Sequence, residues 1–362
     1  MSARPLSILV VAPALGPLGS GKAGGVELTL VSVVSGLLER GHRLTVAAAE
    51  GSSLPPSCQG AALLLEPGAP QESCQHAPRA SDVWMPAQGL LPRLWQRALQ
   101  EPIDVVLNLG YDWLPFWLTP LVEVPVFHLV SMGSVNQVMD AAIAELARWD
   151  QRRLAFHTAS QAADFDLPQP PVVVGNGFDL ADYSLCLEPD PLLGWVGRVA
   201  PEKGLEDAAA AAAQVGQTLA VWGLVEDPGY AERVEASVAP GTLDWRGFLP
   251  TAALQAELGR CRALLNTPKW NEAYGNVVVE AMACGVPVVA YRRGGPGELV
   301  QPGLNGWLVE PDQPSALADA LERVDQIDRR QCRQWVEEQA SKAVLAERLE
   351  QWLQAGLLRK ER

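Results

Sequence analysis

The chain has little of what would tie it to nucleic acid or to a membrane. Its 28 Lys and Arg are outnumbered by 42 Asp and Glu, which gives a formal net charge of -14. Nucleic acids and anionic membranes both require a basic surface, so we expect neither as a main partner. No apolar run approaches the ~18 residues of a transmembrane helix. The apolar start SILVVAPAL runs straight into a Gly/Pro loop, which favours a first strand over a signal peptide.

Cysteine is also scarce, and its positions indicate no disulfide framework. The six cysteines are widely spaced, and no two of them form a C-x-x-C pair. Reduced thiols are typical of cytosolic proteins, so we expect a cytoplasmic protein. The cysteines are Cys58, Cys74, Cys186, Cys261, Cys284 and Cys332.

What the chain does have is a regular alternation of buried strands and amphipathic helices over 362 residues, a length that favours two domains. Such alternation is typical of a parallel sheet covered by helices on both faces. Strands are expected at residues 7–12, 42–49, 103–110 and 124–131, then at 192–199, 217–223, 243–248, 263–268, 286–292 and 306–311.

The expected fold class is therefore α/β, with two doubly wound parallel sheets. A proline-rich stretch over 167–191 interrupts the rhythm and marks the crossing between domains. We place the domains at residues 1–170 and 171–335 and expect ligands at the carboxyl ends of the strands, in a cleft. A final helix over about 329–355 would strap the domains together, so that residues 336–362 return to the first domain.

The stretch GPLGSGKAGG, residues 16–25, satisfies one nucleotide-binding pattern outright and misses another by a single residue. As a P-loop it has Lys22, but Ala23 stands where a Ser or Thr hydroxyl must hold Mg²⁺. As a dinucleotide fingerprint it is followed by Glu50 at the end of the next apolar run, yet APALGPL separates the first strand from the glycines, too long for a tight turn. The fingerprint glycines would be Gly19, Gly21 and Gly24.

The second half is more specific. GWVGRVAPEKG at 194–204 and NTPKWNEAYGNVVVEAMACGVPVVAYRRGGPGELV at 266–300 resemble the signature of glycosyltransferase family 4, retaining enzymes of the GT-B fold. GGVELTL and GHRLTV near the start, VGNGFDL at 174–180 and PGLNGWLVEPDQPSALADAL at 302–321 follow in family order. The resemblance covers nearly the whole chain. It implies two Rossmann-like domains facing a cleft, the first binding an acceptor and the second a nucleotide sugar.

The resemblance assigns a role to several charged residues of the second domain. Arg198 and Lys203 follow a strand, where they would neutralise a diphosphate leaving group; alternatively they are two solvated surface charges. Glu272 would reach the donor sugar, and Glu280, one turn inside a helix from about Asn276, would accept both ribose hydroxyls. An acid-rich helix start is the alternative for that pair. The nucleotide-sugar contacts implied are Gly24, Gly25, Arg198, Lys203, Glu272, Tyr274, Gly275, Asn276 and Glu280.

One histidine and one acidic pair are further candidates for catalytic or metal-binding residues. His128 ends an expected strand and matches a family position that borders the donor sugar, which would place it with Arg198, Lys203 and Glu272 as catalytic; a structural role is the alternative. Asp164 and Asp166 form a literal D-x-D, but enzymes of this fold do not rely on that metal pattern. We expect no metal and no cofactor, with UDP-glucose as the donor substrate.

The first domain carries 10 Lys plus Arg against 13 Asp plus Glu through residue 160, which favours a small soluble acceptor over a lipid. An aromatic segment contributes Tyr111, Trp113, Phe116 and Trp117. Of these Tyr111, Trp113 and Trp117 would stack on a flat acceptor or, alternatively, pack the core. A narrower resemblance, to cyanobacterial UDP-glucose:tetrahydrobiopterin α-glucosyltransferases, implies glucose transfer to a reduced pterin.

Two other functions stay open at this point. A non-hydrolysing UDP-sugar epimerase would share the fold and need no acceptor, and an NAD-dependent dehydrogenase would use the first glycine loop. The departing phosphate would accept the acceptor proton in a front-face attack, because no carboxylate for a covalent route is identifiable. The oligomeric state is not determined by the sequence.

Overall fold

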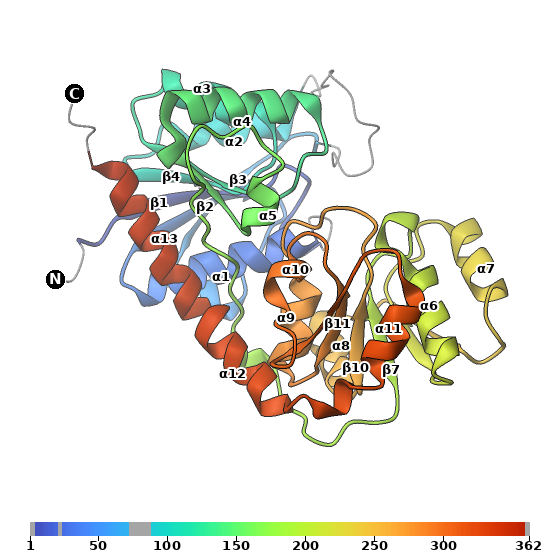
Figure 1. Cartoon of the computed structure of the whole chain (residues 1–362). Coiled ribbons are helices and arrows are strands. Elements are labelled where there is room, and N and C mark those ends of the chain that lie inside the picture. Colours follow the sequence, from blue (N-terminus) through green and yellow to red (C-terminus); the bar gives the residue numbers. More distant parts are fainter. Residues whose placement is uncertain (1–3, 21–23, 72–87, 359–362) are drawn as a thin grey trace. The chain divides into compact units, whose positions relative to one another are not determined.

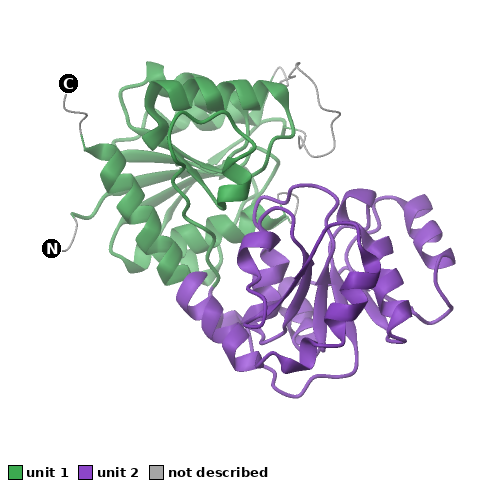
Figure 2. Cartoon of the chain, in the orientation of Figure 1, with its two compact units in different colours: residues 1–178, 342–362 green, residues 179–341 purple. Residues whose placement is uncertain are grey.

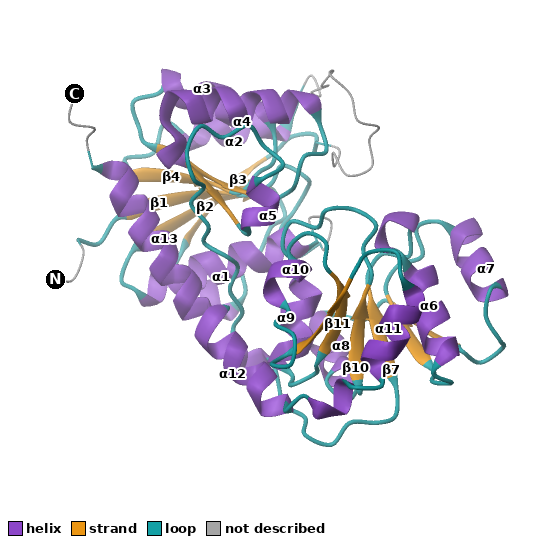
Figure 3. Cartoon of the chain, viewed as in Figure 1, coloured by secondary structure: helices purple, strands orange, loops and turns teal. Residues whose placement is uncertain are grey.

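The computed structural model describes residues 4–20, 24–71 and 88–358. The chain divides into two compact units, residues 1–178 with 342–362 and residues 179–341 (Figure 2). Each unit is built on one six-stranded sheet with helices on both of its faces (Figure 3). The boundaries, after Phe178 and after Ser341, differ from those expected at 170/171 and 335/336.

The sheet of unit 1 has the strand order β3-β2-β1-β4-β5-β6, and every neighbouring pair runs parallel. The strands are β1 (Ser7–Val11), β2 (Arg43–Ala49), β3 (Ala62–Glu66), β4 (Val105–Asn108), β5 (Val126–Val130) and β6 (Leu154–Phe156). The helices are α1 (Gly25–Glu39), α2 (Leu90–Ala98), α3 (Trp113–Leu118), α4 (Gln137–Asp150), α5 (Ala159–Ala162) and α13 (Lys342–Leu357) (Figure 1).

The sheet of unit 2 has the order β12-β11-β10-β7-β8-β9 and is also parallel throughout. Its strands are β7 (Leu193–Val196), β8 (Leu219–Trp222), β9 (Leu243–Gly247), β10 (Ala263–Asn266), β11 (Val288–Tyr291) and β12 (Gly306–Val309). Its helices are α6 (Leu205–Gln214), α7 (Pro228–Ala236), α8 (Thr251–Leu258), α9 (Asn276–Ala283), α10 (Pro296–Leu299), α11 (Pro314–Leu321) and α12 (Arg329–Gln339).

Both sheets have the strand order of a Rossmann-like fold, in which the first strand of the unit lies in the middle and the order reverses beside it. The prediction of two doubly wound parallel sheets is confirmed. The strands are rich in buried Val, Leu and Ala, as expected where helices cover both faces. The crevice at such a reversal is where ligands of this fold class bind, which in unit 2 directs attention to β7 and β10.

The end of the chain differs from the expected single helix over about 329–355. The helix stops at Gln339 and a second one begins at Lys342, whose backbone N–H donates to the carbonyl of Phe178, 2.9 Å away. The N–H of Lys342 thus bonds outside the helix instead of to a carbonyl one turn earlier, which explains the break between α12 and α13. Helix α13 then packs on α1, where a Cβ on Gly36 would lie 2.9 Å from that of Ala346. Only a glycine allows this approach of the two helices.

Five cysteines fall within the described ranges, and none of the five forms a disulfide. The sixth, Cys74, lies outside those ranges. Within the same ranges, no helix combines the length and the apolar character that crossing a membrane requires.

Candidate functional site

The loops that follow β7 and β10 form the candidate site in unit 2. These strands are parallel neighbours, so their carboxyl ends meet at one edge of the sheet. β7 ends at Val196 and is followed by a loop that carries Arg198 and Lys203. β10 ends at Asn266 and is followed by residues 267–275, which carry Glu272. Residues that lie 69 positions apart are thereby brought together.

Lys203 and Glu272 meet at this edge. Lys203 Nζ donates to Glu272 Oε1 at 2.9 Å, and the same ammonium lies 5.0 Å from the ring centre of Trp270. The other carboxylate oxygen, Glu272 Oε2, is buried and has no hydrogen-bond partner among the residues that the structure describes. A buried acceptor without a donor is costly, and such groups in native structures commonly serve a ligand. The structure thus brings Lys203 and Glu272 together, and their role in a site stays a prediction.

Arg198 is held by two carboxylates. Its guanidinium lies 2.9 Å from Glu202 and also forms an ion pair with Glu226, in the loop after β8. That loop reads WGLVED, where the family resemblance leads one to expect a glycine-rich turn. A phosphate that binds at Arg198 therefore competes with two carboxylates for the guanidinium.

Hydrogen bonds to backbone carbonyls join the two loops directly. The hydroxyl of Thr267 donates to the carbonyl of Gly204 at 2.7 Å, and the N–H of Lys269 donates to the carbonyl of Glu202 at 2.8 Å. Gly204 has φ 64°, a conformation that favours glycine. These bonds fix the distance between the loop of Lys203 and the loop of Glu272.

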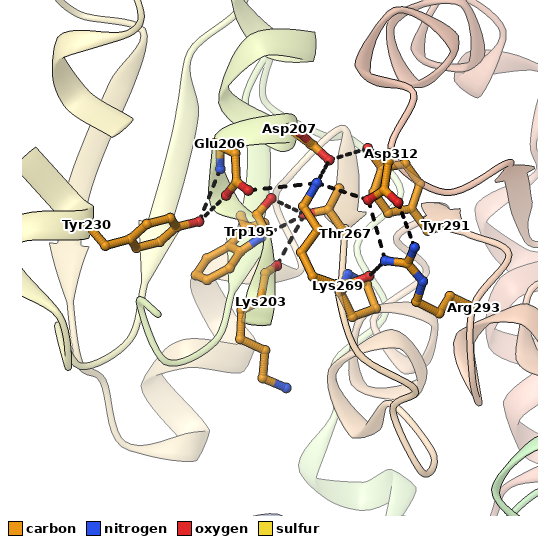
Figure 4. Close-up of polar contacts among 12 residues, drawn as sticks. Trp195, Lys203, Glu206, Asp207, Tyr230, Thr267, Lys269, Tyr291, Arg293 and Asp312 are labelled. Atoms are coloured by element: carbon orange, nitrogen blue, oxygen red, sulfur yellow. Dashed lines mark hydrogen bonds and ion pairs between the residues drawn. The ribbon is translucent and has the colours of Figure 1, made fainter. Parts of the chain in front are cut away.

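A network of charges centred on Lys269 anchors the β10–α9 loop from the other side (Figure 4). Lys269 Nζ donates to Asp207 at the start of α6 and to Asp312 after β12, the latter at 3.0 Å. Asp207 also accepts from the buried Tyr291 hydroxyl at 2.6 Å. Sequence reasoning missed Lys269, because its partners lie 62 and 43 residues away and no local pattern joins them.

Arg293 closes this network. It pairs with Asp312 at 2.7 Å and donates to the carbonyl of Pro268 at 2.8 Å, so that one guanidinium binds both the acid and the loop (Figure 4). The bond from Arg293, and then that from Lys269, hold the pKa of Asp312 below its ordinary value because both favour the ionised carboxylate. The loop that carries Glu272 is therefore fixed at both its backbone and its side chains.

Helix α9 begins at Asn276, as the sequence predicts, after Gly275 in a left-handed conformation with φ 97°. The first amides of a helix and the positive end of its dipole form a ready site for an anion. Tyr274, which precedes this turn, is buried, and Gly295 packs on its backbone so closely that a Cβ there would lie 2.1 Å from its carbonyl oxygen. The turn is thus held in place by the 294–295 loop.

Glu280 lies in the second turn of α9 and is only 7% exposed. Its Oε1 accepts hydrogen bonds from Gln255 Nε2 at 2.9 Å and from the Tyr183 hydroxyl at 3.4 Å. Burial raises the pKa of Glu280 to about 7, although these two bonds oppose the shift. Buried carboxylates with shifted pKa values concentrate at functional sites. Neither donor was singled out from the sequence.

His128 belongs to the buried core of unit 1. It sits inside β5 rather than at the strand's end, and it is fully buried in unit 1. Its Nδ1 lies 3.0 Å from Asn108 Nδ2 and its Nε2 lies 2.7 Å from the Thr119 hydroxyl, while the ring stacks on Phe116 at 4.1 Å. Desolvation lowers its pKa to about 3. With both nitrogens occupied and no exposed surface, His128 has the contacts of a structural residue.

The aromatic segment after β4 divides into core and surface. Residues 113–118 form α3 rather than a loop, because Asp112 accepts from Leu114 N and caps the helix start. Tyr111 and Trp113 pack against the buried cluster of unit 1, and Tyr111 donates to the carbonyl of Gly133 at 2.9 Å. Trp117, by contrast, is 51% exposed. Of the three candidate acceptor contacts, Trp117 has the most surface to offer.

The first glycine stretch is described only in part, since Gly21, Lys22 and Ala23 lie outside the described residues. Gly24 has φ 56° and immediately precedes α1, which begins at Gly25. Gly24 therefore leads directly into a helix.

The D-x-D pair of unit 1 is held by other side chains and backbone. Asp164 accepts from Ser134 N at 3.2 Å, and Asp166 accepts from Arg148 at 3.1 Å. Across the part of the chain that the structure describes, no cluster of three or more His, Cys, Asp or Glu has a metal-binding arrangement.

Comparison with known proteins agrees with this picture. Residues 184–342 match the family of glycosyl transferases group 1. The D-inositol 3-phosphate glycosyltransferase of Geodermatophilus obscurus is 28% identical over 391 aligned positions, which cover 89% of this chain and 83% of that protein. AviGT4, a glycosyltransferase involved in avilamycin A biosynthesis, has a similar structure, with a TM-score of 0.72 at 20% identity over 98% of this chain and 99% of that one.

A second solved structure, Anabaena Alr3699/HepE in complex with UDP and glucose, aligns with a TM-score of 0.71 at 18% identity over 97% of this chain and all of that one. The fold is therefore that of the GT-B glycosyltransferases. The match to glycosyl transferases group 1 therefore falls on residues 184–342, which make up nearly all of unit 2. Neither the relative nor the two structures named here is a pterin glucosyltransferase, so that narrower resemblance stays a proposal.

Proposed function

We propose that the chain is a retaining glycosyltransferase that moves a hexose, in the first place glucose, from UDP-glucose to a hydroxyl of a small soluble acceptor. The observation that carries the proposal is the Lys203–Glu272 pair at the order reversal of the unit 2 sheet, on the same two loops that carry Arg198 and lead into α9. This arrangement combines cations and a helix N-terminus for a diphosphate with an unpartnered carboxylate oxygen for a sugar hydroxyl.

The proposed chemistry needs no protein nucleophile. The bond from the anomeric carbon to the diphosphate oxygen breaks, the acceptor oxygen bonds to the same face of that carbon, and the departing phosphate takes the acceptor's proton. Arg198, Lys203 and the first amides of α9 stabilise the negative charge that grows on the phosphate. No carboxylate is assigned to a covalent intermediate, and no metal is required because the two cations neutralise the diphosphate.

The remaining assignments follow the same geometry. Glu280 accepts the ribose hydroxyls, which suits a buried carboxylate one turn inside α9. Gly24 and Gly25 let the segment before α1 adapt to the donor phosphates. In unit 1, the exposed ring of Trp117 offers a flat surface for an acceptor, and a reduced pterin is our candidate because its pyrimidine ring is planar.

UDP is favoured as the donor's nucleotide because Alr3699/HepE, which shares the fold, was solved with UDP and glucose. The epimerase and the dehydrogenase are disfavoured, since the matched family consists of glycosyl transferases.

The direct test is sugar transfer. The protein is incubated with UDP-glucose and tetrahydrobiopterin in EDTA, and products are identified by mass spectrometry and by the proton coupling of the anomeric centre. A glucosylated pterin with α configuration supports the proposal. A β product rejects retention, a requirement for Mg²⁺ rejects metal independence, and transfer only to other acceptors rejects the pterin. Interconversion of UDP-sugars without acceptor identifies an epimerase.

A further inference from the structure

The carboxylate of Glu280 is embedded in a chain of polar side chains that sequence analysis did not single out. Gln255, on α8, donates from Nε2 to Glu280 Oε1 at 2.9 Å and is itself only 4% exposed. Behind it, Cys284 Sγ donates to Gln255 Oε1 at 3.7 Å, within the range for sulfur. The thiol thus orients the amide so that its N–H₂ faces the carboxylate.

A second donor reaches Glu280 from the segment that enters unit 2. The Tyr183 hydroxyl lies 3.4 Å from the same Oε1. Arg333, on α12, holds the backbone there by donating to the carbonyls of Tyr183 and Ala283 at 2.7 and 2.8 Å. Donors from α8 and from the entering segment therefore meet at one oxygen of Glu280, and α12 holds the backbone of the second donor.

We infer that Gln255, assisted by Tyr183, is a positioning residue that keeps the Glu280 carboxylate ionised and oriented for ribose. This inference rests on the proposed function, because it gives Glu280 a ribose to bind. Both donors engage Oε1, which fixes the rotation of the carboxylate and leaves Oε2 as the oxygen with spare lone pairs. An ionised carboxylate accepts hydroxyl hydrogen bonds on both of its oxygens, whereas a protonated one loses that capacity in part.

Two opposing effects place the pKa of Glu280 near neutral pH. Burial raises the pKa of Glu280 to about 7, and the bonds from Gln255 and Tyr183 pull the pKa of Glu280 down. Other ionisable groups surround it. Burial keeps the thiol of Cys284 protonated by raising its pKa to about 11, and burial likewise raises the pKa of Tyr183. α12 brings Arg329, which donates to backbone carbonyls, and Arg333, which donates to backbone carbonyls and to the Glu337 carboxylate. Glu298 is the one ionisable residue of α10.

The test compares UDP with 2′-deoxy-UDP. Calorimetric dissociation constants for both are measured from pH 5.5 to 8.5, and their ratio at each pH isolates the ribose contact because ionisation of the phosphate cancels. In the wild-type chain the preference for UDP rises with pH, with a midpoint near 7. Glu280→Gln shows a small preference with no such midpoint.

Gln255→Met removes the stronger donor at nearly constant volume, so the midpoint moves up by about one pH unit. Tyr183→Phe moves it up by less, since its bond is longer. Tyr230→Phe removes a hydroxyl that donates to Glu206 elsewhere in unit 2, and it leaves the midpoint unchanged.

A wild-type midpoint retained in Gln255→Met overturns the inference. If Gln255→Met does not fold, a wild-type midpoint in Tyr183→Phe overturns it instead. These outcomes are distinct from a failure of the proposed function, in which the wild-type chain binds neither nucleotide. A positioning role also predicts that both variants keep wild-type melting temperatures within a few degrees at pH 8, so that the shift in midpoint is not a consequence of unfolding.

Discussion

Gly204 faces the carbonyl oxygen of Thr267 so closely that a Cβ on Gly204 would lie 2.1 Å from it. This approach joins the loop of Lys203 to the loop of Glu272. A side chain at position 204 cannot be accommodated without separating the two loops.

Replacing Gly204 by alanine therefore tests whether the two loops must touch. Gly216 is a matched control, because its φ of 65° is nearly that of Gly204 and a Cβ there meets nothing within 4 Å. Both variants carry the cost of a left-handed alanine, about 1 kcal/mol. Gly204→Ala adds the clash, for a total loss of about 3 kcal/mol or more by urea unfolding. Equal losses in the two variants would show that the approach is not required.

The second prediction concerns the leaving group. Lys203→Met is expected to lower kcat by at least about 100-fold while changing the affinity for UDP-glucose less, because charge on the phosphate grows as the bond breaks. The control is Arg260→Met, which removes a cation from an exposed pair with Asp190 in the same unit. Steady-state kinetics on both variants decide the matter, and near-normal turnover in Lys203→Met would contradict the assignment.

The third prediction concerns the Lys269 network. Lys269→Met leaves Asp207 without its cation beside the buried Tyr291, and we expect a loss of about 2 kcal/mol in unfolding free energy. Lys269→Arg should recover most of that loss, and Arg292→Met, in an exposed pair with Glu310, should cost little. Thermal unfolding measures all three. A Lys269→Met variant as stable as the wild type would show that the network does not anchor the loop.

The fourth prediction follows from the raised pKa of Glu280. The folded-state pKa of about 7 exceeds the ordinary 4.5, so the folded protein binds this proton more tightly than the unfolded chain does. Stability is therefore lost as pH rises from 4.5 to 7, by on the order of 3 kcal/mol in full. Glu280→Gln removes that loss. Urea unfolding should find the variant more stable than the wild type at pH 8 and equal to it near pH 4.5.

The fold was predictable because a buried strand appears in the sequence as a short apolar run. A strand is present at every one of the expected positions, and Gly275 followed by Asn276 did start a helix. Two edge strands of unit 1 escaped: β3 is half exposed, and β6 spans only Leu154–Phe156. Both lack the long buried run that makes an interior strand conspicuous.

The site was less predictable where its parts depend on tertiary contacts. Lys203 and Glu272 stood in recognisable blocks, whereas Lys269, Gln255 and Tyr183 act through partners on other elements. His128 illustrates the same limit, since a histidine in an apolar strand has the same sequence pattern whether its ring reaches a surface or, as here, fills the core. Burial and hydrogen-bond partners separate these cases, and neither is encoded locally.

The most direct test of the central claim is the binding of nucleotide sugars by unit 2 residues. Isothermal titration in EDTA with UDP-glucose, the GDP and ADP sugars, and NAD should find UDP-glucose bound most tightly. Glu280→Ala should weaken that binding by about 10-fold or more, as expected for a lost charged acceptor. Binding of NAD without affinity for any nucleotide sugar, or UDP-glucose binding unchanged in Glu280→Ala, would contradict the account.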